Sequence, residues 1–162
     1  MSNPSKRKGT AAESAVRTAA EANGIPAVRV ALAGSGDQGD VWLWPTGNGA
    51  HICIEVKSGE QGANPSWTQI DKWFREAEDE AARTPNCDVA VLVVKRKGSG
   101  MAGDWHSWAR LSDLQSWLTP PSARRYIQPY LSDQRVMMPL GDLLHLIKVG
   151  YYRHHNEGIN HA

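Results

Sequence analysis

The chain is poor in the features that mark several common protein classes. It has only two cysteines, Cys53 and Cys87, so we expect free thiols and no disulfide framework. No apolar run approaches the ~20 residues of a membrane-spanning helix. The start MSNPSKRKG lacks the apolar core of a signal peptide. The formal net charge is only +1, so overall charge does not indicate a nucleic-acid-binding protein. We therefore expect an intracellular, cytoplasmic protein with no membrane association.

The length and the spacing of apolar residues favour one α/β domain. We predict a flexible basic arm over residues 1–8, a single domain over 9–150 and a flexible tail over 151–162. Helices are predicted at 10–23, 66–82, 112–118 and 140–150, and strands at 27–33, 40–44, 51–57, 88–94, 105–110 and 135–139. This order of elements is typical of a mixed central β-sheet flanked by helices.

Two neighbouring predicted strands, DVWLW and HICIEVK, carry charged residues among apolar ones. Side chains alternate between the two faces of a strand, so Ile54 faces a core while Glu55 and Lys57 face the opposite way. A hairpin turn centred in PTGNG pairs Val41 with Ile54 and Asp40 with Glu55. This register aligns the apolar faces of the two strands.

The same register places two carboxylates opposite each other, and like charges in that position repel. A shared proton or a divalent cation would relieve the repulsion. Hard oxygen ligands suit Mg²⁺, for which Mn²⁺ can substitute. With a lysine nearby, such a set fits phosphodiester hydrolysis, because the metal activates water and the ammonium stabilises the charge of the transition state. The structural alternative is a strand that simply ends in a surface ion pair.

Four stretches, RKGTAAESAV, AVRVALAGSGDQGDVWL, CIEVKSG and WTQIDKW, occur in the order and approximate spacing of a known family. Over residues 6–98 the chain resembles the archaeal-type Holliday junction resolvases of the PD-(D/E)XK nuclease superfamily. The resemblance implies a restriction-endonuclease-like core. It also implies a Mg²⁺-dependent, structure-selective DNA endonuclease. Such an enzyme acts as a homodimer, nicks opposing strands of four-way junctions in DNA recombination and repair, and is associated with the nucleoid.

The resemblance also implies roles for individual residues. The implied catalytic residues are Glu13, Asp40, Glu55, Lys57 and Gln69, and the implied metal ligands are Asp40, Glu55, Glu13 and the backbone carbonyl of Val56. Arg29 and Ser35 are implied to contact DNA. From charge alone, Lys6, Arg7 and Lys8 are predicted to bind phosphates, with a solvated arm as the alternative. For Glu13 the alternative is a helix-capping role.

Several features depart from the family or stay open. Gly39 stands where the superfamily name has a proline, and residues 120–134 have no family counterpart. Lys95–Lys97 are either DNA contacts or an ordinary polar strand exit, and the acidic residues 76–80 are expected to face solvent. Trp73, Trp108 and Trp117 are expected to fill the core or a dimer surface. A flap-type or restriction-like nuclease and a non-catalytic branched-DNA-binding module remain the alternative functions.

Overall fold

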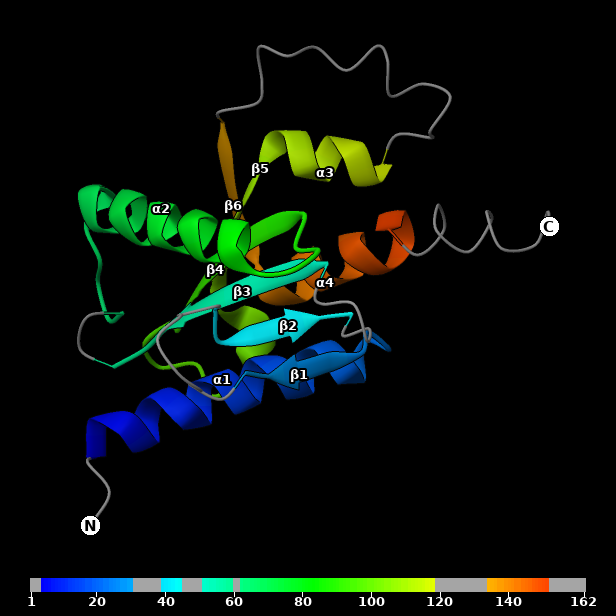
Figure 1. Cartoon of the computed structure of the whole chain (residues 1–162). Coiled ribbons are helices and arrows are strands. Elements are labelled where there is room, and N and C mark those ends of the chain that lie inside the picture. Colours follow the sequence, from blue (N-terminus) through cyan, green and yellow to red (C-terminus); the bar gives the residue numbers. More distant parts are fainter. Residues whose placement is uncertain (1–3, 31–38, 45–50, 60–61, 119–133, 152–162) are drawn as a thin grey trace, which may run out of the picture.

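The computed structural model describes residues 4–30, 39–44, 51–59, 62–118 and 134–151 (Figure 1). Its elements are α1 (Pro4–Ala22), β1 (Ala27–Arg29), β2 (Val41–Leu43), β3 (Ile52–Lys57), α2 (Trp67–Arg83), β4 (Val89–Val94), the 3₁₀ turn η1 (Ala102–Asp104), β5 (His106–Arg110), α3 (Leu111–Leu118), β6 (Arg135–Pro139), α4 (Leu140–Leu146) and the π-helical turn η4 (Ile147–Tyr151). The predicted α/β class and the order of the predicted elements are confirmed.

The described strands form one mixed six-stranded sheet in the order β1-β2-β3-β4-β5-β6. Neighbouring strands are antiparallel except for β3 and β4, which are parallel. A parallel pair needs a crossover connection, and α2 lies in that connection. In the hairpin, Val41 pairs with Ile54 and Leu43 with Ile52. The register predicted from the alternating apolar residues is therefore confirmed.

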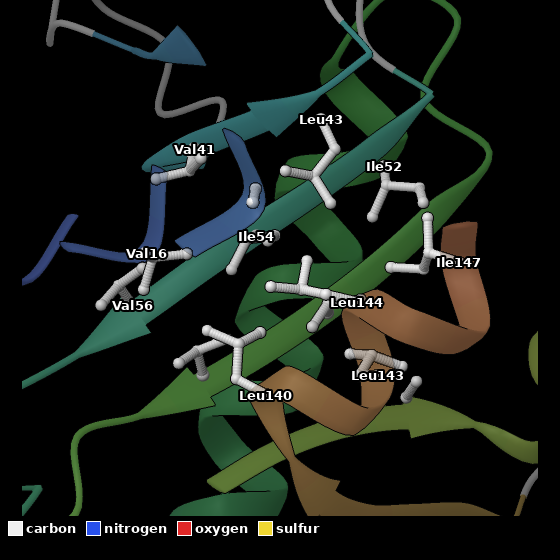
Figure 2. Packing of buried hydrophobic residues seen from close by; sticks show 14 of the residues in the cluster. Val16, Val41, Leu43, Ile52, Ile54, Val56, Leu140, Leu143, Leu144 and Ile147 are labelled. Atoms are coloured by element: carbon white, nitrogen blue, oxygen red, sulfur yellow. The ribbon is translucent and has the colours of Figure 1, made fainter. Parts of the chain in front are cut away.

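Helices cover the two faces of the sheet differently. On one face, α1 and α4 pack against the strands around a single large apolar core that includes Val16, Ile54 and Leu143 (Figure 2). On the other face, α2 is the helix of the described residues that packs against β3 and β4 (Figure 1). Its side chains belong to two smaller clusters, one with Leu92 and one with Cys53. The residues predicted to carry chemistry on β3 point toward the α2 face.

The N-terminal limits of the first two helices differ in how well they were predicted. Helix α2 follows the predicted cap, since the Ser66 hydroxyl accepts a hydrogen bond of 3.2 Å from the Gln69 N–H. Helix α1 begins at Pro4, so its predicted start at Thr10 is wrong. Proline fits the first turn of a helix because its missing N–H has no partner there, and lysine and arginine are good helix formers. Residues 4–8 therefore belong to α1 and not to an extended arm.

Other predictions concern the cysteines and segments outside the described residues. Cys53 and Cys87 are free thiols, as expected, with Cys53 buried. The described part of the chain contains no helix that is both long and apolar enough to cross a membrane. Ser35, residues 120–133 and the tail from residue 152 lie outside the described residues. The side chains of Lys6, Arg7 and Trp117 are also outside the description.

Candidate metal and catalytic centre

Asp40 is held at the start of β2 by two hydrogen bonds to β3. Its N–H donates to the Ile54 carbonyl at 3.0 Å, and its Oδ2 accepts from the Val56 N–H at 2.8 Å. These partners flank Glu55 in the chain, so the two carboxyl residues are neighbours, as the predicted register required. Strand β2 begins only at Val41, so it does not pair with the N–H of Val56 on β3. The Asp40 side chain accepts the hydrogen bond from that N–H instead.

Gly39 adopts a backbone conformation that excludes proline at this position. Gly39 has a φ of +80°, in the left-handed region. The proline ring holds φ near −65°, so proline is excluded from this conformation, whereas glycine adopts it without steric cost. The departure from the superfamily pattern therefore follows from the backbone path that leads into Asp40.

Glu55 and Lys57 share the α2 face of β3 and form a short ion pair. Glu55 is only 7% exposed, and the Lys57 Nζ lies 2.6 Å from its Oε1. The same Nζ lies 3.4 Å from Oε2 of Glu76 on α2. Burial by itself lowers the pKa of Lys57, but the two carboxylates outweigh it and raise that pKa above its usual value. Lys57 is therefore kept as a charged ammonium group.

The pKa of Asp40 is raised above its usual value by burial and by the negative charge nearby. Burial raises it most, the nearby Glu55 carboxylate raises it further, and the hydrogen bond from Val56 opposes them, with a resulting pKa of about 7. Near neutral pH the cluster thus exchanges a proton, or would exchange it for a cation. The raised pKa agrees with the predicted repulsion between the two carboxylates, and a divalent cation in place of the proton stays a prediction.

Glu13 and Arg29 come together beside this cluster. The Arg29 Nη1 donates to Glu13 Oε2 at 3.0 Å, and both side chains are partly exposed. Glu13 still lies near enough to raise the pKa of Asp40. The structure therefore brings Glu13 toward the predicted site, as expected, but pairs it with Arg29, which was predicted to contact DNA. The contact of Arg29 with DNA stays a prediction.

Helix α2 contributes a residue that the sequence interpretation missed. Glu76 reaches Lys57, while the predicted Gln69 lies seven residues earlier, about two helical turns away on the same side of the helix. Of the acidic residues at 76–80 that were expected to face solvent, Asp79 is exposed. For the other three the expectation is wrong: Glu76 pairs with Lys57, Glu78 pairs with Arg110, and Glu80 is buried. The helical spacing from Gln69 was the signal that pointed to Glu76.

A basic groove opens at the end of β3, next to Lys57. This hollow, of about 510 Å³, is lined by Lys8, Ala11, Ser58, Gly59, Ala63, Lys95, Arg96, Lys97 and Gly98. The Lys95 N–H donates to the Lys57 carbonyl at 2.9 Å, which joins the groove to β3. The Lys95 Nζ also lies 5.3 Å from the Trp105 ring centroid. Arg96 and Lys97 form no ion pair with any other described residue.

The donor atoms around Asp40 fit a hard divalent cation with few protein ligands. Mg²⁺ keeps several of its waters and takes one or two carboxylates, for which Asp40 and Glu55 are the candidates. Within the described ranges, no group of three or more His, Cys, Asp or Glu side chains is arranged to hold a metal ion. The fit rests instead on the buried Glu55 carboxylate, the half-buried Asp40 carboxylate beside it and the raised pKa of Asp40. Ligation by Glu13 and by the Val56 carbonyl stays a prediction.

Comparison with known proteins does not decide the family. No protein-family model, no curated protein and no solved structure matches the chain. The motif resemblance therefore remains a prediction.

Proposed function

We propose that the protein is a Mg²⁺-dependent DNA endonuclease. The single observation that carries the proposal is the pair of adjacent carboxylates, Asp40 and Glu55, beside the ammonium group of Lys57. The basic groove next to Lys57 supplies the complementary surface for a phosphate backbone. A protein that only binds DNA gains nothing from a pair of carboxylates at its binding surface, since they repel phosphates. This argument favours catalysis over a non-catalytic binding module.

Each residue has a distinct part in the proposed reaction. Asp40 and Glu55, with the Val56 carbonyl, would hold Mg²⁺, which supplies activation of water and polarisation of the scissile phosphate. Lys57 stabilises the negative charge that grows on the phosphate oxygens in the transition state. Glu55 and Glu76 keep this ammonium charged and oriented before substrate arrives. Lys8, Arg96 and Lys97 position the DNA backbone through its phosphates.

The finer part of the proposal is the choice of substrate. We infer from the motif resemblance that the enzyme is a homodimer and resolves four-way junctions. A twofold enzyme suits a substrate with twofold symmetry, because its two sites then cut paired strands. A flap-type or restriction-like nuclease with the same site is the alternative.

The test is a cleavage panel with matched variants. A labelled four-way junction, a flap and a linear duplex of matched sequence are incubated with the protein and either Mg²⁺ or EDTA. We expect paired symmetric nicks in the junction alone, and only with Mg²⁺. Glu55→Gln should lose cleavage, whereas Glu21→Gln, the same change at an exposed carboxylate, should retain it. Cleavage of all three substrates would remove the junction assignment. Cleavage of none by the folded protein would remove the nuclease assignment.

A further inference from the structure

A second hollow adjoins the basic groove on the α2 side of the sheet. It has a volume of about 260 Å³, and its walls include Trp67, Ile70, Val94, His106 and Trp108. The Lys95–Lys97 segment forms a wall of both hollows. Ligand sites for drug-sized molecules usually enclose roughly 300–1,000 Å³, so this hollow suits a smaller planar group.

Trp67 is unusual among the tryptophans whose side chains the structure describes. It is the first residue of α2 and is 75% exposed, whereas Trp73, Trp105 and Trp108 are each buried. An aromatic ring of this size stabilises a fold when it is buried. Trp67 contributes little to the core and lines a hollow together with Lys95, Arg96 and Lys97. This position indicates a role in binding rather than in stability.

Trp108 supplies an independent observation on the wall of the same hollow. The residue is only 6% exposed, and its Nε1–H has no hydrogen-bond partner among the described residues. A buried donor without a partner costs about 1–3 kcal/mol. The His106 ring packs edge-on against the Trp108 ring, with 5.8 Å between their centroids. The Nε1 atom is itself buried, so an acceptor atom of a ligand would reach the indole donor only after the Trp108 ring shifts.

The hollow also lies close to the proposed catalytic residues. Val94, on its wall, is the register partner of Lys57 in the parallel pair of β3 and β4. The next residue, Lys95, donates its N–H to the Lys57 carbonyl. A strand whose scissile phosphate lies at Lys57 would therefore have a neighbouring nucleotide beside the hollow.

We propose that this hollow takes one unpaired nucleobase of the DNA substrate, stacked on Trp67, with its flanking phosphates on Arg96 and Lys97. Stacking on an aromatic ring beside cationic side chains is how proteins hold single-stranded nucleic acid, and every base has a face that stacks and an edge with acceptor atoms. The inference rests on the proposed function, because it takes DNA as the substrate. It adds that the substrate presents an unstacked nucleotide next to the cleavage site.

Equilibrium binding in EDTA tests this proposal separately from cleavage. The full chain is titrated against a labelled single-stranded oligonucleotide and against the same oligonucleotide made abasic, which keeps the phosphates and removes the bases. Trp67→Ala should weaken binding of the intact strand about tenfold and leave the abasic strand unchanged. Trp67→Phe should retain most of the affinity. Met101→Ala, a matched change at an exposed apolar residue outside both hollows, should change neither.

Three results would overturn the proposal. The first is a Trp67→Ala variant that binds the intact strand as the original chain does, and the second is an equal loss on the intact and abasic strands. The third is a wild-type chain that does not bind single strands at all. If sedimentation shows that Trp67→Ala dissociates a dimer without a base-dependent loss, the hollow is an interface between copies of the chain. Base-dependent binding without cleavage of any substrate would retain the stacking site and reject the nuclease.

Discussion

The two faces of β3 illustrate how neighbouring residues of one strand serve different ends. Ile52, Ile54 and Val56 point into the single large core that α1 and α4 cover. Glu55 and Lys57 point the other way, where α2 covers the sheet in two smaller clusters. Because the apolar face is covered by two helices, the strand stays in place even though its other face carries buried charge. The face that stabilises the fold and the face that carries the proposed chemistry can therefore be tested apart.

The largest expected effect is on activity at Glu55. Glu55→Gln keeps the shape of the side chain and removes its charge, so Mg²⁺ loses a ligand and Lys57 loses its closest partner. If the metal contributes about 4 kcal/mol to lowering the barrier, cleavage falls on the order of 1,000-fold. Single-turnover cleavage of the best substrate measures this, with circular dichroism to show that the variant folds. Retained activity in a folded variant would contradict the assigned role.

The adjacent residue on the other face should show the opposite pattern. Ile54 is fully buried, and Ile54→Ala leaves a cavity in the large core. We expect the free energy of unfolding to fall by about 2–5 kcal/mol. The variant that remains folded at low temperature should cleave at a near-normal rate. Urea unfolding measures the stability change, and Val28→Ala, at an exposed apolar residue of β1, is the control with a small expected change. A loss below 1 kcal/mol would mean that this core relaxes around the cavity.

The free energy of unfolding should depend on pH because Asp40 titrates at a higher pH in the folded state than in the unfolded state. The pKa of Asp40 is raised from 3.8 to about 7, so between these values the folded state holds a proton that the unfolded state has released. In the absence of metal, stability should therefore fall as pH rises through this range, by a few kcal/mol at most. Asp40→Asn mimics the protonated form and should lack this fall, so that it is more stable than the original chain at about pH 8.

Urea unfolding in EDTA at about pH 5 and about pH 8 checks this expectation. Asp79→Asn, at an exposed aspartate of α2, is the matched control and should follow the original chain. Mg²⁺ at the higher pH should stabilise the original chain and not Asp40→Asn, since the cation would neutralise the carboxylates after the proton has left. A pH profile of Asp40→Asn that follows the original chain would assign the charge excess to another residue.

The smallest expected effect is at Glu76, the outer partner of Lys57. Its carboxylate is partly exposed and lies 3.4 Å from the Lys57 Nζ, farther than Glu55 does. Glu76→Gln should change stability by less than about 1 kcal/mol and cleavage by less than about tenfold. The cleavage rate and the free energy of unfolding are measured for this variant, with Lys72→Met as a control for the other partner of Glu76. A small loss of rate would mean that Glu76 only orients Lys57. A loss as large as that of Glu55→Gln would place Glu76 among the catalytic residues.

Sequence by itself determined the features that depend on residues close together in the chain. The alternation in HICIEVK assigned the two faces of β3, the hairpin register followed from the alignment of those faces, and Ser66 began α2 as its capping pattern predicted. The adjacency of Asp40 and Glu55 came from the same register. These features could be predicted because strand alternation, turn position and helix capping act over a few residues and have few alternatives.

Tertiary structure alone decided what faces these residues from other elements. The pairing of Lys57 with Glu76 depends on how α2 packs across the parallel strands, and the pairing of Glu13 with Arg29 depends on where α1 crosses the sheet. The hollow between Trp67 and Trp108 likewise joins the start of α2 to β5. Such contacts are set by the packing of whole apolar faces, and local patterns do not specify which of many polar side chains that packing brings together.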